Sequence, residues 1–308
     1  MELLVANNWN TTADNSVVLN EQSFRYEYDA RRRLTMKKVP GSGEMWMVYD
    51  KWDRLVLMQD ANLRPNQKWL FTKYDYLNRP IMTGWFTNAT YTTQSAMQGN
   101  LNSQNLARFE IVDLTKTYGY TTQLSFPSTG FPDPQTITFY DNYDWTAVYG
   151  SGFHDRDNDS DPMFFTADNN NYPYPQPLTT TSNTRGMITG SWTKALGTSK
   201  AIVKSIFYDD KGRTVQVKSN NITGDQSNPT SIFTTQYDFS GQPLAAHLPQ
   251  TTKGDASQHT LFVMTTYNYD DLGRPVEIKK WLDAYTPEGH ILVPEKPLCV
   301  MNMMHLAS

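Results

Sequence analysis

The chain has 308 residues, of which 38% are hydrophobic, 19% are charged and 13% are aromatic, and its net charge is −4. So many aromatic residues exclude a solvated, disordered chain, and a sequence rich in Tyr, Thr and Trp but poor in charge is typical of β-sheet. The charge excludes a general basic field for nucleic acid. No apolar run approaches the roughly 20 residues of a membrane helix, so we expect neither a nucleic-acid partner nor a membrane span.

The first 19 residues are a lead-in without a motif. Their start, residues 1–9, has no basic segment and no apolar segment long enough for a signal peptide, so none is expected within this sequence. The single cysteine, Cys299, excludes internal disulfides and a thiolate metal cluster.

A short motif, Tyr-Asp-x-x-Gly-Arg with tolerated variants, then recurs. Three copies lie in a first block, residues 20–85, and three in a second block, residues 201–282. Their tyrosine–aspartate pairs are Tyr28 and Asp29, Tyr49 and Asp50, Tyr74 and Asp75, Tyr208 and Asp209, Tyr237 and Asp238, and Tyr269 and Asp270. Such a repeat is not expected by chance, and it organises the whole chain.

The motif predicts a β-hairpin turn. An aspartate at the first position of a type I turn caps the turn with its carboxylate, and the fourth position requires a positive φ. The residues at this position that suit it are Gly212, Gly241 and Gly273, with Asn78 and Asp53 as the next best tolerated. In the first copy Arg32 takes this place at a cost of about 1 kcal/mol, so we expect that turn to be built differently.

Strands are predicted on both sides of each turn. Residues 24–28, 214–218 and 265–269 alternate in the pattern of a half-buried strand. We therefore predict an all-β chain of consecutive antiparallel hairpins that form one long, twisted and curved sheet. The tyrosine before each turn and the arginine after it, such as Arg213 or Arg274, leave on neighbouring strands, where ring and guanidinium are expected to stack.

The middle of the chain, residues 86–200, interrupts this pattern. Residues 88–106 show no periodicity that assigns an element, and the proline-rich residues 168–177 predict an irregular loop. A degenerate copy of the motif lies near residues 140–145. No boundary between independent domains is visible, so we expect one architecture with a decorated centre, followed by an unpatterned tail at residues 283–308.

The six copies resemble the YD repeats of the RHS family, in the variety found in Bacteroidetes. The resemblance covers about residues 20–282, including the copy at 140–145. It implies part of a hollow β-shell, secreted or at the cell surface, that encloses toxin cargo in contact-dependent delivery or takes part in adhesion and carbohydrate association. The chain has no core segment of the Arg-Tyr-Tyr-Asp-Pro type and nothing that resembles a toxin domain, so our hypothesis is a partial product of a longer gene.

Few residues indicate chemistry. Asp157, Asp159 and Asp161 fall at positions 1, 3 and 5 of a calcium loop, with Asp168 at position 12. Because Pro162 stands where such a loop needs glycine, a solvated acidic loop is the preferred interpretation, and we expect no metal or cofactor. The five histidines lack metal-ligand spacing, and no nucleophile elbow, phosphate loop or dinucleotide fingerprint occurs, so no enzymatic activity is expected.

Tryptophans gather in the first block. Trp46 and Trp52 are candidates for stacking on a sugar, although packing inside the sheet is the preferred interpretation. We predict a non-enzymatic scaffold whose open sheet edges pair with further repeats or another chain. The alternative is a carbohydrate-binding surface adhesin, and a hydrolase hidden in the central segment is a third interpretation.

Overall fold

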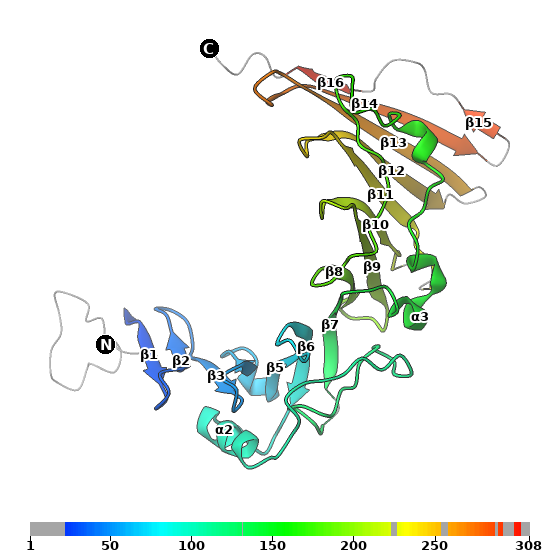
Figure 1. The fold of residues 1–308 in the computed structure, drawn as a ribbon. Coiled ribbons are helices and arrows are strands. Elements are labelled where there is room, and N and C mark those ends of the chain that lie inside the picture. The colour runs from blue at the N-terminus through cyan, green and yellow to red at the C-terminus, as the bar shows by residue number, and fades with distance from the viewer. Residues whose placement is uncertain are drawn as a thin grey trace. The chain divides into compact units, whose positions relative to one another are not determined.

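The computed structural model of the protein describes residues 22–130, 132–222, 227–253, 258–286, 289–291 and 299–302 (Figure 1). Antiparallel strands dominate these residues, so the prediction of an all-β chain of consecutive hairpins is confirmed. The chain divides into two compact units, Met1–Thr138 and Phe139–Ser308, whereas the sequence indicates a single architecture. None of the helices in the described residues is long and apolar enough to cross a membrane.

The strands of the first unit follow one another in the sheet in chain order. They are β1 (Arg25–Tyr28), β2 (Leu34–Lys38), β3 (Met45–Tyr49), β4 (Leu55–Gln59), β5 (Lys68–Tyr74), β6 (Pro80–Thr87) and β7 (Asp133–Tyr140), whose last two residues belong to the second unit. The 3-10 turn η2 (Arg64–Asn66) joins β4 to β5. Residues 88–130, here called the first strap, contain helix α2 (Gln94–Asn102) where the sequence assigns no element; the Thr93 side chain caps its start.

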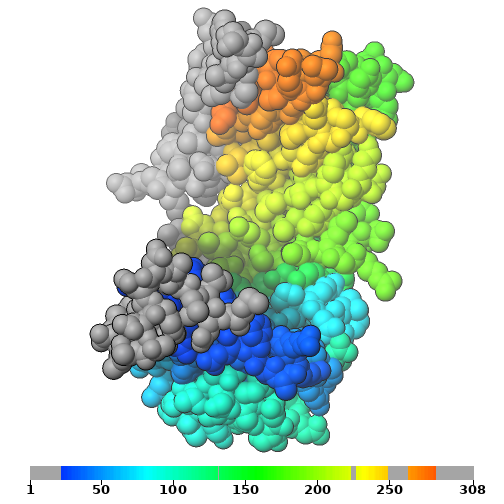
Figure 2. All heavy atoms as spheres, turned by 90° about the vertical axis from the view of Figure 1, so that its left-hand side faces the viewer, coloured from blue at the N-terminus to red at the C-terminus, as the bar shows by residue number. Residues whose placement is uncertain are grey.

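The second unit continues the same strand order. Its strands are β8 (Ile188–Lys194), β9 (Ala201–Tyr208), β10 (Thr214–Ser219), β11 (Ser231–Tyr237), β12 (Pro243–Lys253), β13 (Gln258–Tyr269), β14 (Pro275–Thr286), β15 (Gly289–Ile291) and β16 (Cys299–Asn302). Both β15 and β16 pair with β14, so the tail that the sequence leaves unpatterned contributes two short strands. Figure 2 shows the second unit as successive bands from yellow-green to orange, each beside its neighbour in the sequence.

Residues 141–187 precede β8 and are here called the second strap. They contain α3 (Thr146–Tyr149), η3 (Ser151–Phe153) and η4 (Asp161–Met163). The prediction of a repeat copy near 140–145 is wrong as a hairpin turn, because Thr146 N–H donates to the Tyr143 carbonyl at 3.0 Å and the chain enters α3 instead of returning as a strand. Figure 1 shows the second strap, in green, running along the strands of its own unit.

One register recurs where hairpin follows hairpin. The residue three places after the turn arginine, or its equivalent Gln242, pairs with the residue three places before the next tyrosine. The pairs that show this are Met36 with Trp46, Leu57 with Phe71, Met82 with Ile137, Gln216 with Thr234, and Ala245 with Thr266. The tyrosines concerned are between 21 residues (28 to 49) and 66 residues (74 to 140) apart, so the register does not depend on the length of the return loop.

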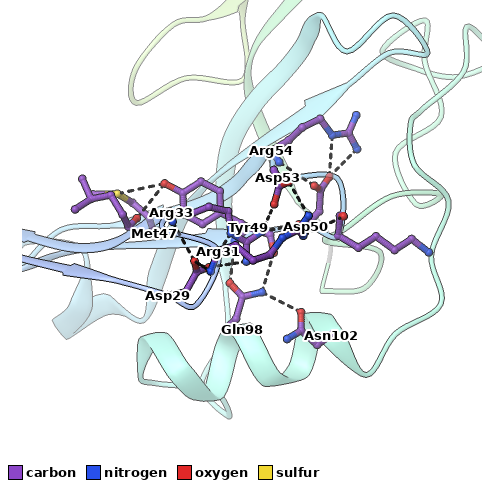
Figure 3. A network of polar contacts seen from close by, with 12 residues as sticks. Asp29, Arg31, Arg33, Met47, Tyr49, Asp50, Asp53, Arg54, Gln98 and Asn102 are labelled. Atoms are coloured by element: carbon purple, nitrogen blue, oxygen red, sulfur yellow. Dashed lines mark hydrogen bonds and ion pairs between the residues drawn. The ribbon is translucent and has the colours of Figure 1, made fainter.

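Each strap covers one face of the sheet in its own unit. In the first unit β5 buries alternate side chains, Trp69, Phe71 and Lys73, all at most 1% exposed. From α2, the Gln98 amide accepts from the N–H of Tyr49 at 2.9 Å and donates to its carbonyl at 2.7 Å (Figure 3). The Gln98 amide thus forms with the N–H and carbonyl of Tyr49 the two hydrogen bonds that a neighbouring strand would otherwise form.

The same device holds the second strap, with the roles reversed. Gln216 on β10 donates to the Asp157 carbonyl at 2.7 Å and accepts from the Asp157 N–H at 2.8 Å. Gln236 on β11 pairs with both backbone groups of Phe165 at 2.8 and 3.0 Å. Both glutamines are at most 2% exposed, so a polar strap lies on this face without leaving these backbone groups unpaired.

Trp145, at the start of α3, fixes the second strap at β8. Its indole stacks on Phe139 with centroids 4.6 Å apart and donates to the Thr189 hydroxyl at 3.2 Å. A Cβ at Gly190 would lie only 2.1 Å from the Trp145 ring. Only glycine lets β8 approach the ring this closely.

Candidate functional site: the repeat turns and the ladder that joins them

The repeat turns share one set of hydrogen bonds. In the second copy the N–H of Asp50 donates to the Arg54 carbonyl at 3.0 Å, and the N–H of Asp53 donates to the Asp50 carbonyl at 3.2 Å. Asp50 Oδ1 accepts from the backbone of Trp52 and Arg54 at 3.0 and 2.9 Å, and Oδ2 accepts from Arg54 Nε at 2.8 Å. The carboxylate therefore closes the turn and also holds its arginine.

The fourth position of the turn has a positive φ in all six copies. The values are 62° at Arg32, 64° at Asp53, 65° at Asn78, 76° at Gly212, 97° at Gly241 and 75° at Gly273. The expectation that the Arg32 turn is built differently is wrong, because Asp29 accepts from the backbone of Arg31 and Arg33 at 2.9 and 3.0 Å as in the other copies. We attribute this to the carboxylate's hydrogen bonds, which offset the strain at Arg32.

In five of the six copies the turn carboxylate is bound to the arginine of its own copy. At the last turn, the hydrogen bond from the Arg274 backbone N–H is the main cause of a lowered pKa of Asp270, and the Arg274 side chain acts in the same direction. In the copy at Asp238, Gln242 replaces the arginine, and the Ser240 hydroxyl donates to both carboxylate oxygens at 2.8 and 2.9 Å. Every turn aspartate is therefore already engaged by its own turn.

The turn arginines stack on the tyrosine of the following hairpin. The guanidinium carbons of Arg33, Arg54 and Arg213 lie 5.0, 4.6 and 4.9 Å from the ring centroids of Tyr49, Tyr74 and Tyr237. The predicted stacking therefore occurs, but not between the tyrosine and arginine of one copy. The ion pair with the turn aspartate explains the change of partner, since it directs the guanidinium outward toward the next turn.

The tyrosine hydroxyls form the return connection. Those of Tyr49, Tyr74, Tyr208, Tyr237 and Tyr269 donate to the carbonyls of Leu34, Leu55, Ile188, Thr214 and Pro243 at 2.7–2.9 Å. In four of the five, this carbonyl belongs to the residue directly after the turn arginine, or after Gln242, of the preceding hairpin. Arginine and tyrosine thus join successive hairpins in both directions, an arrangement that we call the ladder (Figure 3).

The straps complete the ladder at the tyrosine carbonyls. Five hydrogen bonds of 2.7–3.1 Å reach these carbonyls from the straps. The Gln98 amide donates to Tyr49, and the Tyr172 hydroxyl donates to Tyr269. The N–H groups of Glu110, Thr181 and Gln176 donate to Tyr74, Tyr208 and Tyr237. These tyrosines lie at the register shift beside the turn, where the regular strand pairing is interrupted. The straps therefore satisfy the acceptor that each turn exposes.

A buried ion pair that the sequence does not reveal ties the first strap to β5. Lys73 Nζ donates to Glu110 Oε1 at 2.8 Å and to the carbonyls of Ser125 and Pro127 at 2.9 and 3.0 Å, and both charged side chains are 0% exposed. Glu110 also accepts from Thr121 and from Ser125. Burial raises the pKa of Glu110, but Lys73 and these donors outweigh it and leave the pKa below its usual value.

The acidic loop is not assembled for calcium. Asp161 is paired with the Arg156 guanidinium, and Asp157 Oδ1 accepts the N–H of Asp159 at 3.1 Å. Across the described residues, no group of three or more His, Cys, Asp or Glu is placed to hold a metal ion. The carboxylates of this loop instead lie around the buried Lys218, whose ammonium donates to the Gly152 carbonyl at 3.0 Å.

The two sugar-stacking candidates occupy different environments. The Trp46 ring lies against Arg64, 4.3 Å from its centroid, and against the buried Trp69, and its indole donates to Glu44 at 3.1 Å. Trp52 is 36% exposed at a turn and lines a cavity of about 260 Å³. Of the two, Trp52 is the ring that faces an open space.

Comparisons with known proteins give slight likenesses only. No family model matches the chain, and no curated protein matches it. Among solved structures it is similar to the crystal structure of TcdB2-TccC3, with 13% identity and a TM-score of 0.22, over 91% of this chain and 14% of that chain. It is also similar to the crystal structure of TcdB2-TccC3-TEV, with 13% identity and a TM-score of 0.18, over 87% of this chain and 16% of that chain. The chain spans a small part of these proteins, and at such TM-scores the likeness carries no argument about function.

Proposed function

We propose that this chain is a non-enzymatic structural scaffold, a run of hairpins that forms part of a larger wall of the same repeats. The observation that carries the proposal is the ladder, in which one register, one arginine–tyrosine contact and one tyrosine hydrogen bond recur whatever the loop length. Each turn aspartate is engaged within its turn, so the repeated polar residues serve the connection between hairpins. The finer role is enclosure or presentation of cargo, such as a toxin, by a secreted or surface-bound assembly, as the YD-repeat resemblance implies.

The first strand supplies the joint to further repeats. β1 ends the described sheet, and on its outer side it has no strand partner among the described residues. The aromatic side chains of Tyr26 and Tyr28 on this strand, and of Phe24 just before it, are 37%, 58% and 44% exposed. Tyr28 is the tyrosine of the first motif copy, and residues 1–21 contain no arginine or lysine that would stack on its ring. A hairpin of the same repeat supplies both a strand for β1 and a guanidinium for Tyr28.

The other end of the described sheet is formed by two short strands. There β14 pairs with β15 through residues 284–286 and with β16 through residues 277–280. The chain's own C-terminal strands thus occupy the outer side of β14. We place the proposed joint at β1, because Tyr28 on this strand is the tyrosine of the first motif copy.

The test is a chimera in which residues 201–230, a complete hairpin with its return loop, replace residues 1–21 and are followed directly by residue 22. In the native pairing Gln216 lies opposite Thr234, three residues before Tyr237. The fusion places Gln216 opposite Arg25, three residues before Tyr28, and brings Arg213 to the Tyr28 ring. We expect the first unit to gain about 1–2 kcal/mol in unfolding free energy from the new guanidinium–ring contact and tyrosine hydrogen bond.

Two control chimeras make this test specific. Arg213→Ala in the grafted hairpin removes the guanidinium but keeps the strand, so part of the gain disappears. One extra residue before residue 22 lengthens only the return loop, and because the register does not depend on the length of that loop, the gain should be retained. Equal stability of the three chimeras and the parent chain would contradict a modular scaffold.

A carbohydrate-binding adhesin is the second candidate, and the exposure of Trp52 favours it. A glycan array is its direct test. Selective binding that Trp52→Ala abolishes and Trp46→Ala preserves would support it, while an array without any selective signal would count against it.

A further inference from the structure

The cavity beside Trp52 has the composition of a small-molecule site. It lies in the first unit, between the second repeat turn and the first strap. Its apolar lining includes Val56, Leu101 and Phe126, which are 4%, 7% and 5% exposed, together with the partly exposed Trp52 indole. Pockets for small ligands combine such apolar walls with a few polar groups, and a volume of about 260 Å³ suits a single substituted ring.

The cavity carries one positive charge that no nearby carboxylate balances. Three cationic side chains line it. Arg54 is paired with Asp50 at 2.7 Å and Lys73 with Glu110 at 2.8 Å. Lys51 forms no ion pair with any described residue, and its ammonium lies 4.6 Å from the centroid of the Trp52 ring. A ligand that enters beside Trp52 therefore meets a cation.

Two side-chain amides at the end of the first strap's helix add hydrogen-bonding groups to the same cavity. Asn102 Oδ1 accepts from Gln98 at 3.0 Å, and Gln104 Nε2 donates to Asn100 at 3.0 Å. These bonds leave the Asn102 amide as a donor and the Gln104 carbonyl as an acceptor toward the lining. The cavity thus offers an aromatic face, a cation, a donor and an acceptor within one space that is open to solvent beside Trp52.

We propose that this cavity binds a small compound with a six-membered ring and one carboxylate. The carboxylate lies against the Lys51 ammonium, the ring stacks on Trp52, and ring substituents bond to Asn102 and Gln104. A sugar acid and an aromatic acid share this chemistry. The site goes beyond the scaffold function, because Lys51 and Trp52 are not among the arginines and tyrosines of the ladder, although the Arg54 guanidinium also lies 5.4 Å from the centroid of the Trp52 ring.

Isothermal titration calorimetry on the full chain tests the site with four probes: glucuronate and benzoate, and their neutral counterparts glucose and benzyl alcohol. We expect at least one carboxylate to bind, and its neutral counterpart to bind about tenfold more weakly or not at all. Binding of glucuronate alone identifies a sugar acid, and binding of benzoate alone identifies an aromatic acid. No heat from either carboxylate up to about 10 mM, or equal affinity for the neutral partner, would overturn the proposal.

Matched variants locate the binding. Lys51→Gln should weaken the carboxylate by about tenfold and leave the neutral counterpart unchanged, and Trp52→Ala should weaken both. Lys211→Gln and Leu272→Ala alter exposed side chains of other repeat turns and should change nothing. Circular dichroism establishes that each variant folds. Carboxylate affinity that survives Lys51→Gln in a folded chain would also overturn the proposal, whatever the chimera experiment shows about the scaffold.

Discussion

The Arg54 guanidinium lies 4.6 Å from the centroid of the Tyr74 ring, one hairpin further along the chain. The Tyr74 hydroxyl donates back to the carbonyl of Leu55, the residue after Arg54, at 2.8 Å. Tyr74 therefore joins the two hairpins by two contacts, one to the Arg54 guanidinium and one to the Leu55 carbonyl. Because each contact contributes about 0.5–1.5 kcal/mol, the ladder stabilises the sheet by a small increment at each step.

Removal of one ladder hydroxyl should cost a single hydrogen bond. Tyr74→Phe keeps the ring beneath Arg54 and loses only the bond to Leu55, so we expect about 1 kcal/mol less unfolding free energy in urea. Tyr26→Phe is the control, since Tyr26 lies on the outer strand and is 37% exposed. Equal losses in the two variants would show that the hydroxyl bond does not matter.

Glycine in place of Arg32 should stabilise the first turn. Arg32 has a φ of 62°, a conformation that costs an ordinary residue about 1 kcal/mol and glycine nothing. We expect Arg32→Gly to raise the unfolding free energy by about 0.5–1 kcal/mol. Ala30→Gly, in the same turn without a positive φ, should lower it through the entropy of the unfolded chain. A loss in both variants would mean that the Arg32 side chain contributes more than its strain costs.

The buried pair should make the first unit sensitive to acid. Glu110→Gln leaves the Lys73 charge without its partner inside the protein, and we expect a loss of about 3–5 kcal/mol at neutral pH. The pKa of Glu110 is lower in the folded chain than its usual value, so this stabilisation is complete above the unfolded pKa and is lost as the pH falls through the folded one. Urea unfolding at pH values from 7 down to about 3 should show the difference between parent and variant shrinking. A difference that is constant with pH would argue against an ionised Glu110.

The glutamine bonds should hold the second strap in place. Gln216→Met removes the amide that pairs with both backbone groups of Asp157, and we expect a loss of about 2 kcal/mol with faster amide exchange at residues 151–165. Gln135→Met is the matched control, because the Gln135 amide bonds only within its own strand, to Asp133. If amide exchange at residues 151–165 is equally fast in both variants, the position of the second strap does not depend on Gln216.

The turns were predictable from the sequence because their determinants are local. An aspartate and a residue that tolerates positive φ, three places apart, specify the turn, and Gly212, Gly241 and Gly273 fit this pattern without tertiary information. The arginine's partner was not predictable, because the bond from Arg54 Nε to Asp50 redirects the guanidinium. This redirection depends on how the side chains lie in three dimensions, which the local sequence does not specify.

The straps were not predictable for a different reason. Lys73 and Glu110 are 37 residues apart, and Gln216 and Asp157 are 59 apart, so no periodicity links the partners. The straps also bury apolar side chains such as Met97, Phe126 and Phe153, but these are scattered without a periodicity that the sequence would reveal. The Trp52 cavity depends on the same first strap, which is why the sequence could propose the ring but not the space beside it.

The most direct test of the scaffold is amide hydrogen exchange at residues 25–28 in the chimera that places residues 201–230 ahead of residue 22. β1 is the outer strand of the described sheet in the parent chain, and the account predicts that the graft slows exchange of its outward N–H groups by about tenfold or more. Arg213→Ala in the graft should lose part of this protection, and one extra residue in the return loop should leave it unchanged, because the register does not depend on loop length. Exchange at the parent rate in the in-register chimera would contradict the claim that these hairpins are interchangeable units of a wall.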